Sequence, residues 1–210
     1  MPLNDRDYMQ PARQRRTSYR TSSIDSFLAN PIYMIIFINL LIYIGTLINR
    51  NLVIWLGLSP SLFTARPWTL ITSMFVHQEF WHLFGNMLVL FFFGRVVYKM
   101  MGGWRFTVIY LVGGIAGNIL YLWLGQPLSI AIGASGAVYA LAGALVVLMP
   151  TMKVLMWFIL PMPLWVVVLV FFVAWSFIPG VAWQAHIGGL VVGLIAGFIF
   201  RRQMRYIIYR

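Results

Sequence analysis

The residues best suited to chemistry in this chain are a serine and a histidine that stand in long apolar stretches. Ser135 lies between Gly133 and Gly136 and opens the apolar run 135–149, and His186 lies in a later run. A serine hydroxyl becomes a nucleophile when a histidine takes its proton, so the pair predicts nucleophilic catalysis. Packing is the competing interpretation, because small residues and serine are common where membrane helices approach closely.

The residues around the pair favour a direct contact between them. Tyr139 follows Ser135 by one helical turn, and Gly189 and Gly193 follow His186 at helical spacing. Glycine stripes allow two helix backbones to come very close. A hydrogen bond between a serine and a histidine on neighbouring helices requires this closeness, so we favour chemistry over packing.

The composition defines the class of protein. The 210 residues are 61% hydrophobic and 9% charged, which indicates an all-α polytopic membrane protein. The chain has no cysteine, which excludes disulfides, thiolate metal sites and a cysteine nucleophile. Pro161 and Pro163 predict a kink in the fifth apolar run. Six runs are expected to cross the membrane: 31–48, 80–101, 104–124, 135–149, 154–175 and 183–200.

The basic residues predict the topology. If six segments cross the membrane, thirteen of the fifteen lysines and arginines fall on one side, and only Arg50 and Arg66 fall on the other. This split predicts that both termini are cytoplasmic; the plasma (inner) membrane is expected only from the family resemblance described below. The split also argues against nucleic-acid binding, because the basic residues do not form one patch. The expected parts are a basic tail (1–29), a six-helix core (30–200) and a second basic tail (201–210).

Helix geometry brings the polar residues to one depth. His82 and Asn86 lie four positions apart and so share one helix face. At 1.5 Å per residue, these two, Ser135 and His186 all lie roughly 20–25 Å from the inner ends of their helices. The hydrocarbon core is about 30 Å thick, so the four residues meet in one layer below the outer surface.

The scarcity of acids shapes the expected mechanism. The four carboxylates of the chain are Asp5, Asp7 and Asp25 in the first tail and Glu79 near the outer surface. We therefore expect a Ser-His dyad without a third acidic member, its histidine held by packing against Tyr139. The oxyanion of the intermediate would be stabilised by backbone N–H groups at Ser135, where a helix begins, and by side-chain donors from His82 and Asn86. No cofactor and no metal is expected.

Three motifs resemble those of the rhomboid family of intramembrane serine proteases. They are Gly133-Ala134-Ser135-Gly136, His186-Ile187-Gly188-Gly189 and His82-Leu83-Phe84-Gly85-Asn86, with His77 as a further histidine before the last. The resemblance implies a six-helix bundle, Ser135 as nucleophile, His186 as base, and His82 with Asn86 at the oxyanion. Single-span membrane proteins are the expected substrates, because a substrate helix must unwind locally before attack. One departure is that many members carry Trp-Arg in the first loop, where this chain has Trp68-Thr69 and Arg66 two residues earlier.

Two alternative functions are weighed against this one. A transporter or metal-binding membrane protein would use the three histidines, but cation pathways usually carry intramembrane carboxylates, and the six runs contain none. His77 and His82 are also five apart, a poor spacing for a metal pair. The second alternative is a non-catalytic rhomboid-like binder of membrane helices, which predicts a missing serine or histidine. Neither is missing.

Overall fold

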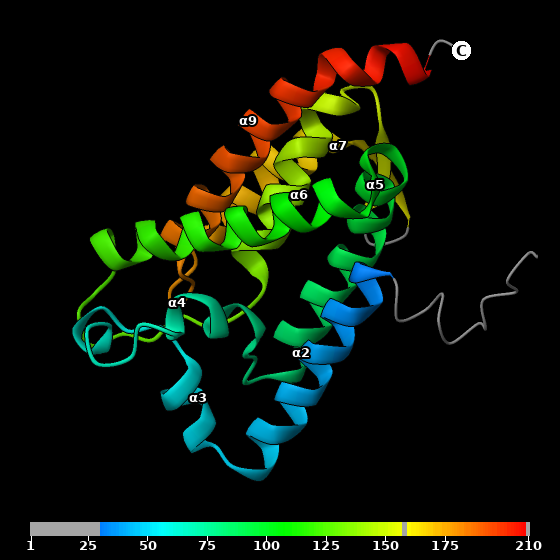
Figure 1. Ribbon diagram of the computed structural model, residues 1–210. Coiled ribbons are helices and arrows are strands. Elements are labelled where there is room, and N and C mark those ends of the chain that lie inside the picture. Colours follow the sequence, from blue (N-terminus) through cyan, green and yellow to red (C-terminus); the bar gives the residue numbers. More distant parts are fainter. Residues whose placement is uncertain (1–29, 157–158, 209–210) are drawn as a thin grey trace, which may run out of the picture.

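A helical bundle makes up most of the chain in the computed structural model, which describes residues 30–156 and 159–208 (Figure 1). The expected N-terminal tail, 1–29, lies outside the described residues. Shorter segments join the long helices at both ends of the bundle. The long helices are α2 (Pro31–Ile48), α5 (Phe80–Leu124), α6 (Ser135–Leu148) and α9 (Trp183–Ile208).

The first two long helices follow the bounds that the sequence predicts. Asn30 caps α2, because its Oδ1 accepts a hydrogen bond from the Ile32 N–H at 3.0 Å. In α5, Gly102 adopts φ +80°, a conformation that glycine tolerates and other residues rarely adopt. Gly102 therefore divides α5 into two arms, which correspond to the expected runs 80–101 and 104–124 and lie at an angle to each other in Figure 1.

The loop between α2 and α5 is a folded layer. Its short helices are α3 (Asn51–Leu56), η2 (Pro60–Leu62), α4 (Thr69–Thr72) and η3 (Ser73–Phe75). Arg66 donates a hydrogen bond to the Ile54 carbonyl at 2.9 Å, and its guanidinium lies 4.3 Å from the ring centre of Trp55. Trp68 Nε1 donates to the Trp55 carbonyl at 3.1 Å. Arg66 and Trp68 thus tie this loop together although Thr69 replaces the arginine of the usual pair.

The fifth apolar run, 154–175, differs from the prediction of one kinked helix. Its first part is an antiparallel hairpin of β1 (Lys153–Met156) and β2 (Leu160–Pro163). Pro161 and Pro163 explain the difference, because each lacks an amide hydrogen and disfavours helical backbone in the residue before it. Helix begins only after the second proline. What we call the fifth segment then comprises α7 (Leu164–Val166), the π-helical η4 (Val167–Phe172) and α8 (Val173–Ser176).

The last helix is longer than expected. The sequence predicts its end near Phe200, whereas α9 continues to Ile208 and so includes residues 201–208 of the predicted second tail. Its glycine stripe contacts α6 directly, as the sequence predicts. A Cβ at Gly189 would overlap the Gly136 carbonyl, and one at Gly193 would overlap the Ala140 carbonyl. Larger residues at these positions would force the two helices apart.

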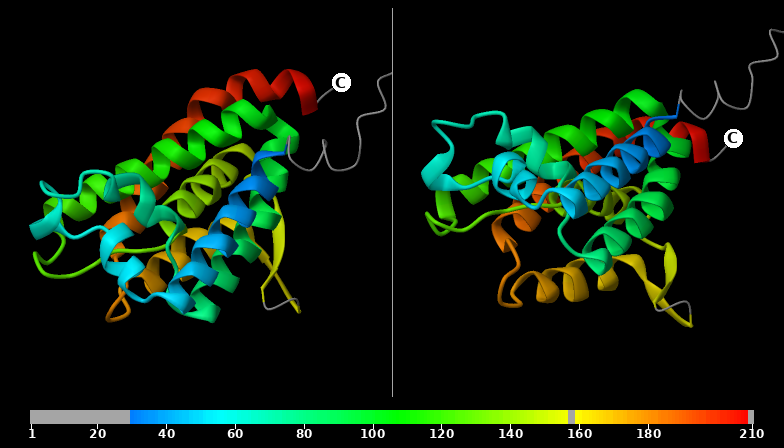
Figure 2. Two further views of the ribbon diagram at one scale, coloured as in Figure 1. Left: turned by 60° about the horizontal axis from the view of Figure 1, so that its bottom comes forward. Right: turned by 90° about the horizontal axis from the view of Figure 1, so that it is seen from below.

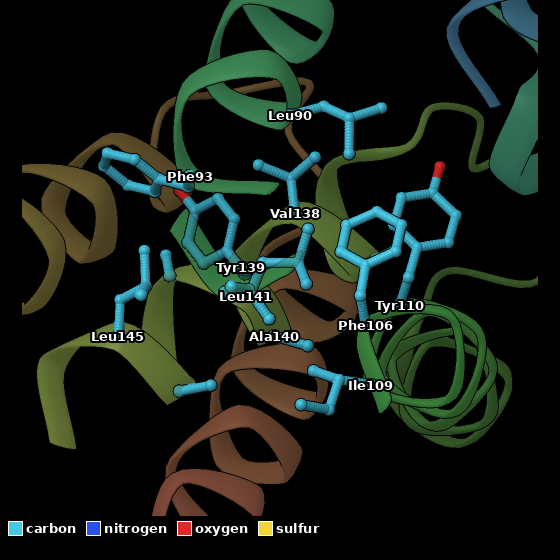
Figure 3. Close-up of a cluster of buried hydrophobic side chains, with 14 of the residues drawn as sticks. Leu90, Phe93, Phe106, Ile109, Tyr110, Val138, Tyr139, Ala140, Leu141 and Leu145 are labelled. Atoms are coloured by element: carbon cyan, nitrogen blue, oxygen red, sulfur yellow. The ribbon is translucent and has the colours of Figure 1, made fainter. Parts of the chain in front are cut away.

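Helix α6 lies inside the bundle and contacts α9, α5, η3 and the fifth segment (Figure 2). Its 14 residues span about 21 Å, less than the roughly 30 Å of a hydrocarbon core. A short buried helix is compatible with a membrane because protein, not lipid, covers the irregular backbone at its ends. Figure 3 displays the core around it, where Val138, Tyr139 and Leu141 of α6 meet side chains from both arms of α5.

The helices define a multi-pass membrane protein. Three of the described helical stretches are long and apolar enough to cross a membrane: Pro31–Ile48, Phe80–Leu124 and Trp183–Arg201. Two shorter apolar stretches, Ser135–Leu148 and Leu164–Ser176, accompany them. The count of six spans, the orientation of the termini and the bounds of the three parts stay predictions.

Candidate active site

The serine stands at the first position of α6, at the end of a loop that is fixed from several sides. Gly133 has φ +116° and donates its N–H to the Ser73 carbonyl at 2.9 Å. Ala131 pairs with Leu58 in an isolated antiparallel bridge. Because Ser135 is the first residue of the helix, its backbone N–H has no acceptor one turn earlier within α6. The hydroxyl and a helix-terminal N–H group that has no acceptor within α6 thus belong to the same residue.

The histidine meets this serine across the interface of α6 and α9. His186 Nε2 lies 2.8 Å from Ser135 Oγ, a hydrogen-bond distance. The imidazole is only 6% exposed and stacks on Tyr139, with 4.2 Å between ring centres and 18° between planes. The close approach at Gly136 and Gly189 makes this contact possible. The structure therefore brings together the pair that the sequence singles out and the aromatic ring expected to hold it.

A second serine, which the sequence reasoning missed, contacts the other nitrogen of the histidine. Ser176 Oγ, at the end of α8, lies 2.9 Å from His186 Nδ1. The stacking on Tyr139 that the sequence predicts is present, and the contact with Ser176 adds a hydrogen bond that the sequence reasoning did not include. Ser176 is completely buried and also contacts Tyr139 and Phe172. A lone serine at the end of an apolar run was the available signal, but nothing in the sequence tells which distant residue it meets.

His82 lies against the loop that precedes the nucleophile candidate. A Cβ added to Gly133 would come within 2.7 Å of His82 Nε2, so the close approach of this ring requires a glycine there. Asn86, one turn further along α5, donates one amide hydrogen to the His82 carbonyl at 2.9 Å. An amide group has a second hydrogen, which leaves Asn86 able to donate to another acceptor.

His77 lies beside His82 and contacts the same loop. Its side chain is completely buried, its Nε2 accepts a long hydrogen bond of 3.4 Å from the Ala134 N–H, and its ring meets that of His82 edge to face at 4.9 Å. Burial, and secondarily the neighbouring His82, lower the pKa of His77 from 6.5 to about 3, against a smaller opposing effect of a backbone hydrogen bond at Phe75. His77 is therefore neutral at physiological pH, as an acceptor must be.

Asn118, another polar residue of the membrane-embedded runs, holds the first loop. Its Nδ2 donates to the Leu70 carbonyl at 2.7 Å and to Ser73 Oγ at 2.9 Å. Ser73 in turn accepts from the N–H of Gly133 through its carbonyl. Asn118 thus connects the second arm of α5 to the loop before Ser135. Within the part of the chain that the structure describes, three or more histidine, aspartate or glutamate side chains do not gather into a possible metal site.

The fold and these contacts define a helical multi-pass membrane protein with a buried serine and histidine in hydrogen-bond contact. Residues 64–203, more than half of the chain, match the model of the Rhomboid domain, and the chain belongs to the rhomboid family. The resemblance seen in the sequence motifs is confirmed.

Curated relatives agree with this assignment. The chain is 38% identical over 157 residues to "Rhomboid protein 1, mitochondrial" of Saccharomyces cerevisiae, which covers 65% of this chain and 42% of the relative. It is 39% identical over 77 residues to "Putative rhomboid protease YdcA" of Bacillus subtilis, an alignment that covers 36% of this chain and 38% of the relative. With "Rhomboid protease GluP" of the same bacterium the identity is 30% over 130 residues, an alignment that covers 61% of this chain and 25% of the relative. The chain thus aligns with less than half the length of each of these relatives.

Proposed function

We propose that this protein is an intramembrane serine endopeptidase in which Ser135 is the nucleophile and His186 the general base. The observation that carries the proposal is the 2.8 Å contact between Ser135 Oγ and His186 Nε2 at a buried helix interface. His186 takes the hydroxyl proton as Oγ attacks the carbonyl carbon of the scissile bond. The imidazolium then gives that proton to the leaving amine, and a water molecule, activated in the same way, hydrolyses the acyl-enzyme.

The negative charge on the substrate oxygen needs donors during both steps. In our proposal these are the helix-terminal N–H of Ser135 and side-chain N–H groups of His82 and Asn86. The position of His82 beside Gly133 supports a role at this loop. Its neighbour Asn86 retains a free amide hydrogen for the same task.

The proposed substrates are single-span membrane proteins cut near the outer end of the span. A transmembrane helix hides its peptide bonds in internal hydrogen bonds, so a substrate must unwind locally before attack. We expect Gly, Pro or polar residues near the cut, and a small residue before it, because glycines line this part of the protein. The proposed location is the plasma membrane with both termini cytoplasmic, although the name of the yeast relative indicates a mitochondrial protein.

The test is incubation of the purified protein with a panel of single-span proteins, comparing the wild type with Ser135→Ala. A serine-reactive fluorophosphonate probe gives a second reading. We expect cleavage and labelling that disappear in Ser135→Ala and persist in Ser129→Ala, a matched change of another serine on the preceding loop. Binding of membrane helices without cleavage or labelling would instead favour the non-catalytic binder. Transport or bound metal without labelling would favour the transporter.

A further inference from the structure

We propose that Ser176 is a positioning residue for the base, completing a neutral chain of Ser135, His186 and Ser176 that ends on the backbone carbonyl of Phe172. This inference rests on the proposed function of Ser135 and His186. This series of hydrogen bonds joins three helices. Ser135 opens α6, His186 lies in α9 and Ser176 ends α8. It supplies to the imidazole the partner that an acidic residue provides in a Ser-His-Asp triad.

The distances form a continuous series of hydrogen bonds. Ser135 Oγ lies 2.8 Å from His186 Nε2, and His186 Nδ1 lies 2.9 Å from Ser176 Oγ. Ser176 Oγ donates to the Phe172 carbonyl at 2.9 Å, and the Tyr139 hydroxyl donates to the same carbonyl at 2.6 Å. Tyr139 is also the residue that stacks on the imidazole. The ring is therefore fixed on its face by packing and on its Nδ1 edge by a hydroxyl.

The proposal assigns a direction to each hydrogen bond in the series. The Phe172 oxygen can only accept, and in the proposed arrangement it receives the single hydroxyl hydrogen of Ser176 as well as that of Tyr139. Ser176 Oγ is then an acceptor, and the hydrogen between it and the imidazole belongs to Nδ1 of His186. This tautomer leaves Nε2 without a hydrogen, which is the state in which it can accept the proton of Ser135.

The same arrangement suits the reaction step. When Ser135 Oγ bonds to the carbonyl carbon, its proton passes to Nε2 and His186 becomes a cation with hydrogens on both nitrogens. Ser176 Oγ accepts the Nδ1 hydrogen in that state without any rearrangement, and the Phe172 carbonyl dipole lies behind it. Preorganised acceptors of this kind stabilise a charge that develops during the reaction. The proton later leaves Nε2 for the departing amine, so the Ser176 bonds do not change.

A structural explanation is weighed against this one. A serine in a helix can satisfy its hydroxyl by bonding the carbonyl four residues earlier, and Thr107 does so with the Gly103 carbonyl at 2.9 Å. Ser176 makes the same bond, but its oxygen also lies 2.9 Å from a ring nitrogen of a distant helix. Thr107 therefore provides a matched control for the loss of a back-bonded hydroxyl alone.

The experiment compares Ser176→Ala, Ser176→Thr and the control Thr107→Ala with the wild type, using a single-span substrate. Loss of one hydrogen bond to a developing charge should lower kcat on the order of 10- to 100-fold in Ser176→Ala, with KM little changed. Ser176→Thr keeps the hydroxyl and should recover most of the activity, and Thr107→Ala should match the wild type. An unchanged kcat in folded Ser176→Ala would overturn the inference, and so would an equal loss of activity in Thr107→Ala.

A second measurement observes the tautomer of His186 in the wild type. The chain has three histidines, so selective ¹⁵N labelling gives few imidazole signals, and His186→Ala identifies those of His186. We expect a protonated Nδ1 and an unprotonated Nε2 in the wild type at neutral pH. The opposite tautomer would overturn the inference. If the wild type cleaves nothing, the proposed function fails, whereas an active wild type with the wrong tautomer refutes only the role of Ser176.

Discussion

At the scale of single residues, Ser135 and His186 are expected to act as one unit. Ser135→Ala and His186→Ala should each abolish cleavage, and the double variant should be no worse than either, because a nucleophile without its base gains little. The measurement is turnover of a single-span substrate, with thermal unfolding in detergent as the check that each variant folds. Substantial turnover by either single variant would contradict the assignment of both roles.

Alanine substitution of either proposed donor, His82 or Asn86, should lower kcat less than Ser135→Ala does, and the two effects should add. Removal of one oxyanion donor typically lowers kcat about 10²- to 10³-fold, so His82→Ala and Asn86→Ala should each fall in that range and the double variant should approach Ser135→Ala. Steady-state kinetics on one substrate measure all three. Wild-type kinetics in both single variants would rule out the donor role.

The buried imidazole of His77 should make the fold sensitive to acid. Its pKa of about 3 in the folded protein lies below the ordinary 6.5, so the unfolded chain binds the proton more readily between these values. The contribution of neutral His77 to the free energy of unfolding is complete above about pH 6.5 and is lost as the pH falls toward 3. Over this range the free energy of unfolding falls by up to about 1.4 kcal/mol per pH unit. Thermal unfolding measured between pH 7.5 and 4.5 should show this decline, and His77→Gln should flatten it. An identical pH dependence in the variant would contradict this origin.

At the scale of elements, local signals in the sequence predict the bounds of the first helices but neither the hairpin nor the long-range partners. The expected run 31–48 and the expected break after residue 101 match the structure, where Asn30 caps α2 and Gly102 interrupts α5. The hairpin before the fifth segment was missed because hydropathy outweighed the effect of Pro161 and Pro163 on the backbone. Ser176 was missed for a different reason, since its partner is a histidine on another helix whose position the fold alone determines.

The glycine contacts between α6 and α9 give a test at this scale. Gly193→Ala should strongly destabilise the protein, because its Cβ would overlap the Ala140 carbonyl, a backbone atom that cannot move without shifting α6. Gly85→Ala is the matched control: it lies in α5 with no atom within 4 Å of a new Cβ, so it should be neutral or stabilise by about 0.5–1 kcal/mol. Thermal unfolding in detergent compares the two. Equal unfolding temperatures would show that the helices separate easily.

At the scale of the whole molecule, the orientation of His186 depends on how the fifth segment packs against the other helices. Tyr139 of α6 and Ser176 both donate hydrogen bonds to the Phe172 carbonyl. The fifth segment therefore contacts α6 and also carries Ser176, the partner of His186. In the second view of Figure 2 the gold fifth segment lies at the edge of the bundle. Its inner contact with the first arm of α5 includes the stacked rings of Phe93 and Phe172, whose centres are 6.3 Å apart.

The last prediction concerns how membrane substrates reach Ser135. We expect the fifth segment to move away from α5 to admit a substrate helix from the lipid, because it is short and lies at the bundle edge. The chain has no cysteine, so Phe93→Cys with Phe172→Cys introduces a unique pair that a short bifunctional thiol reagent can join. Joining should slow cleavage of single-span substrates much more than cleavage of short soluble peptides.

The same double variant without the reagent is the matched control, since it carries both substitutions but leaves the segment free. A soluble peptide should still be cleaved after joining, because the tether keeps Ser176 beside His186 and blocks only the lateral route. Equal slowing of peptides and membrane substrates would contradict lateral access through this face. Cleavage sites mapped to the inner half of substrate spans would also contradict it, because the proposed nucleophile is expected at a layer nearer the outer surface.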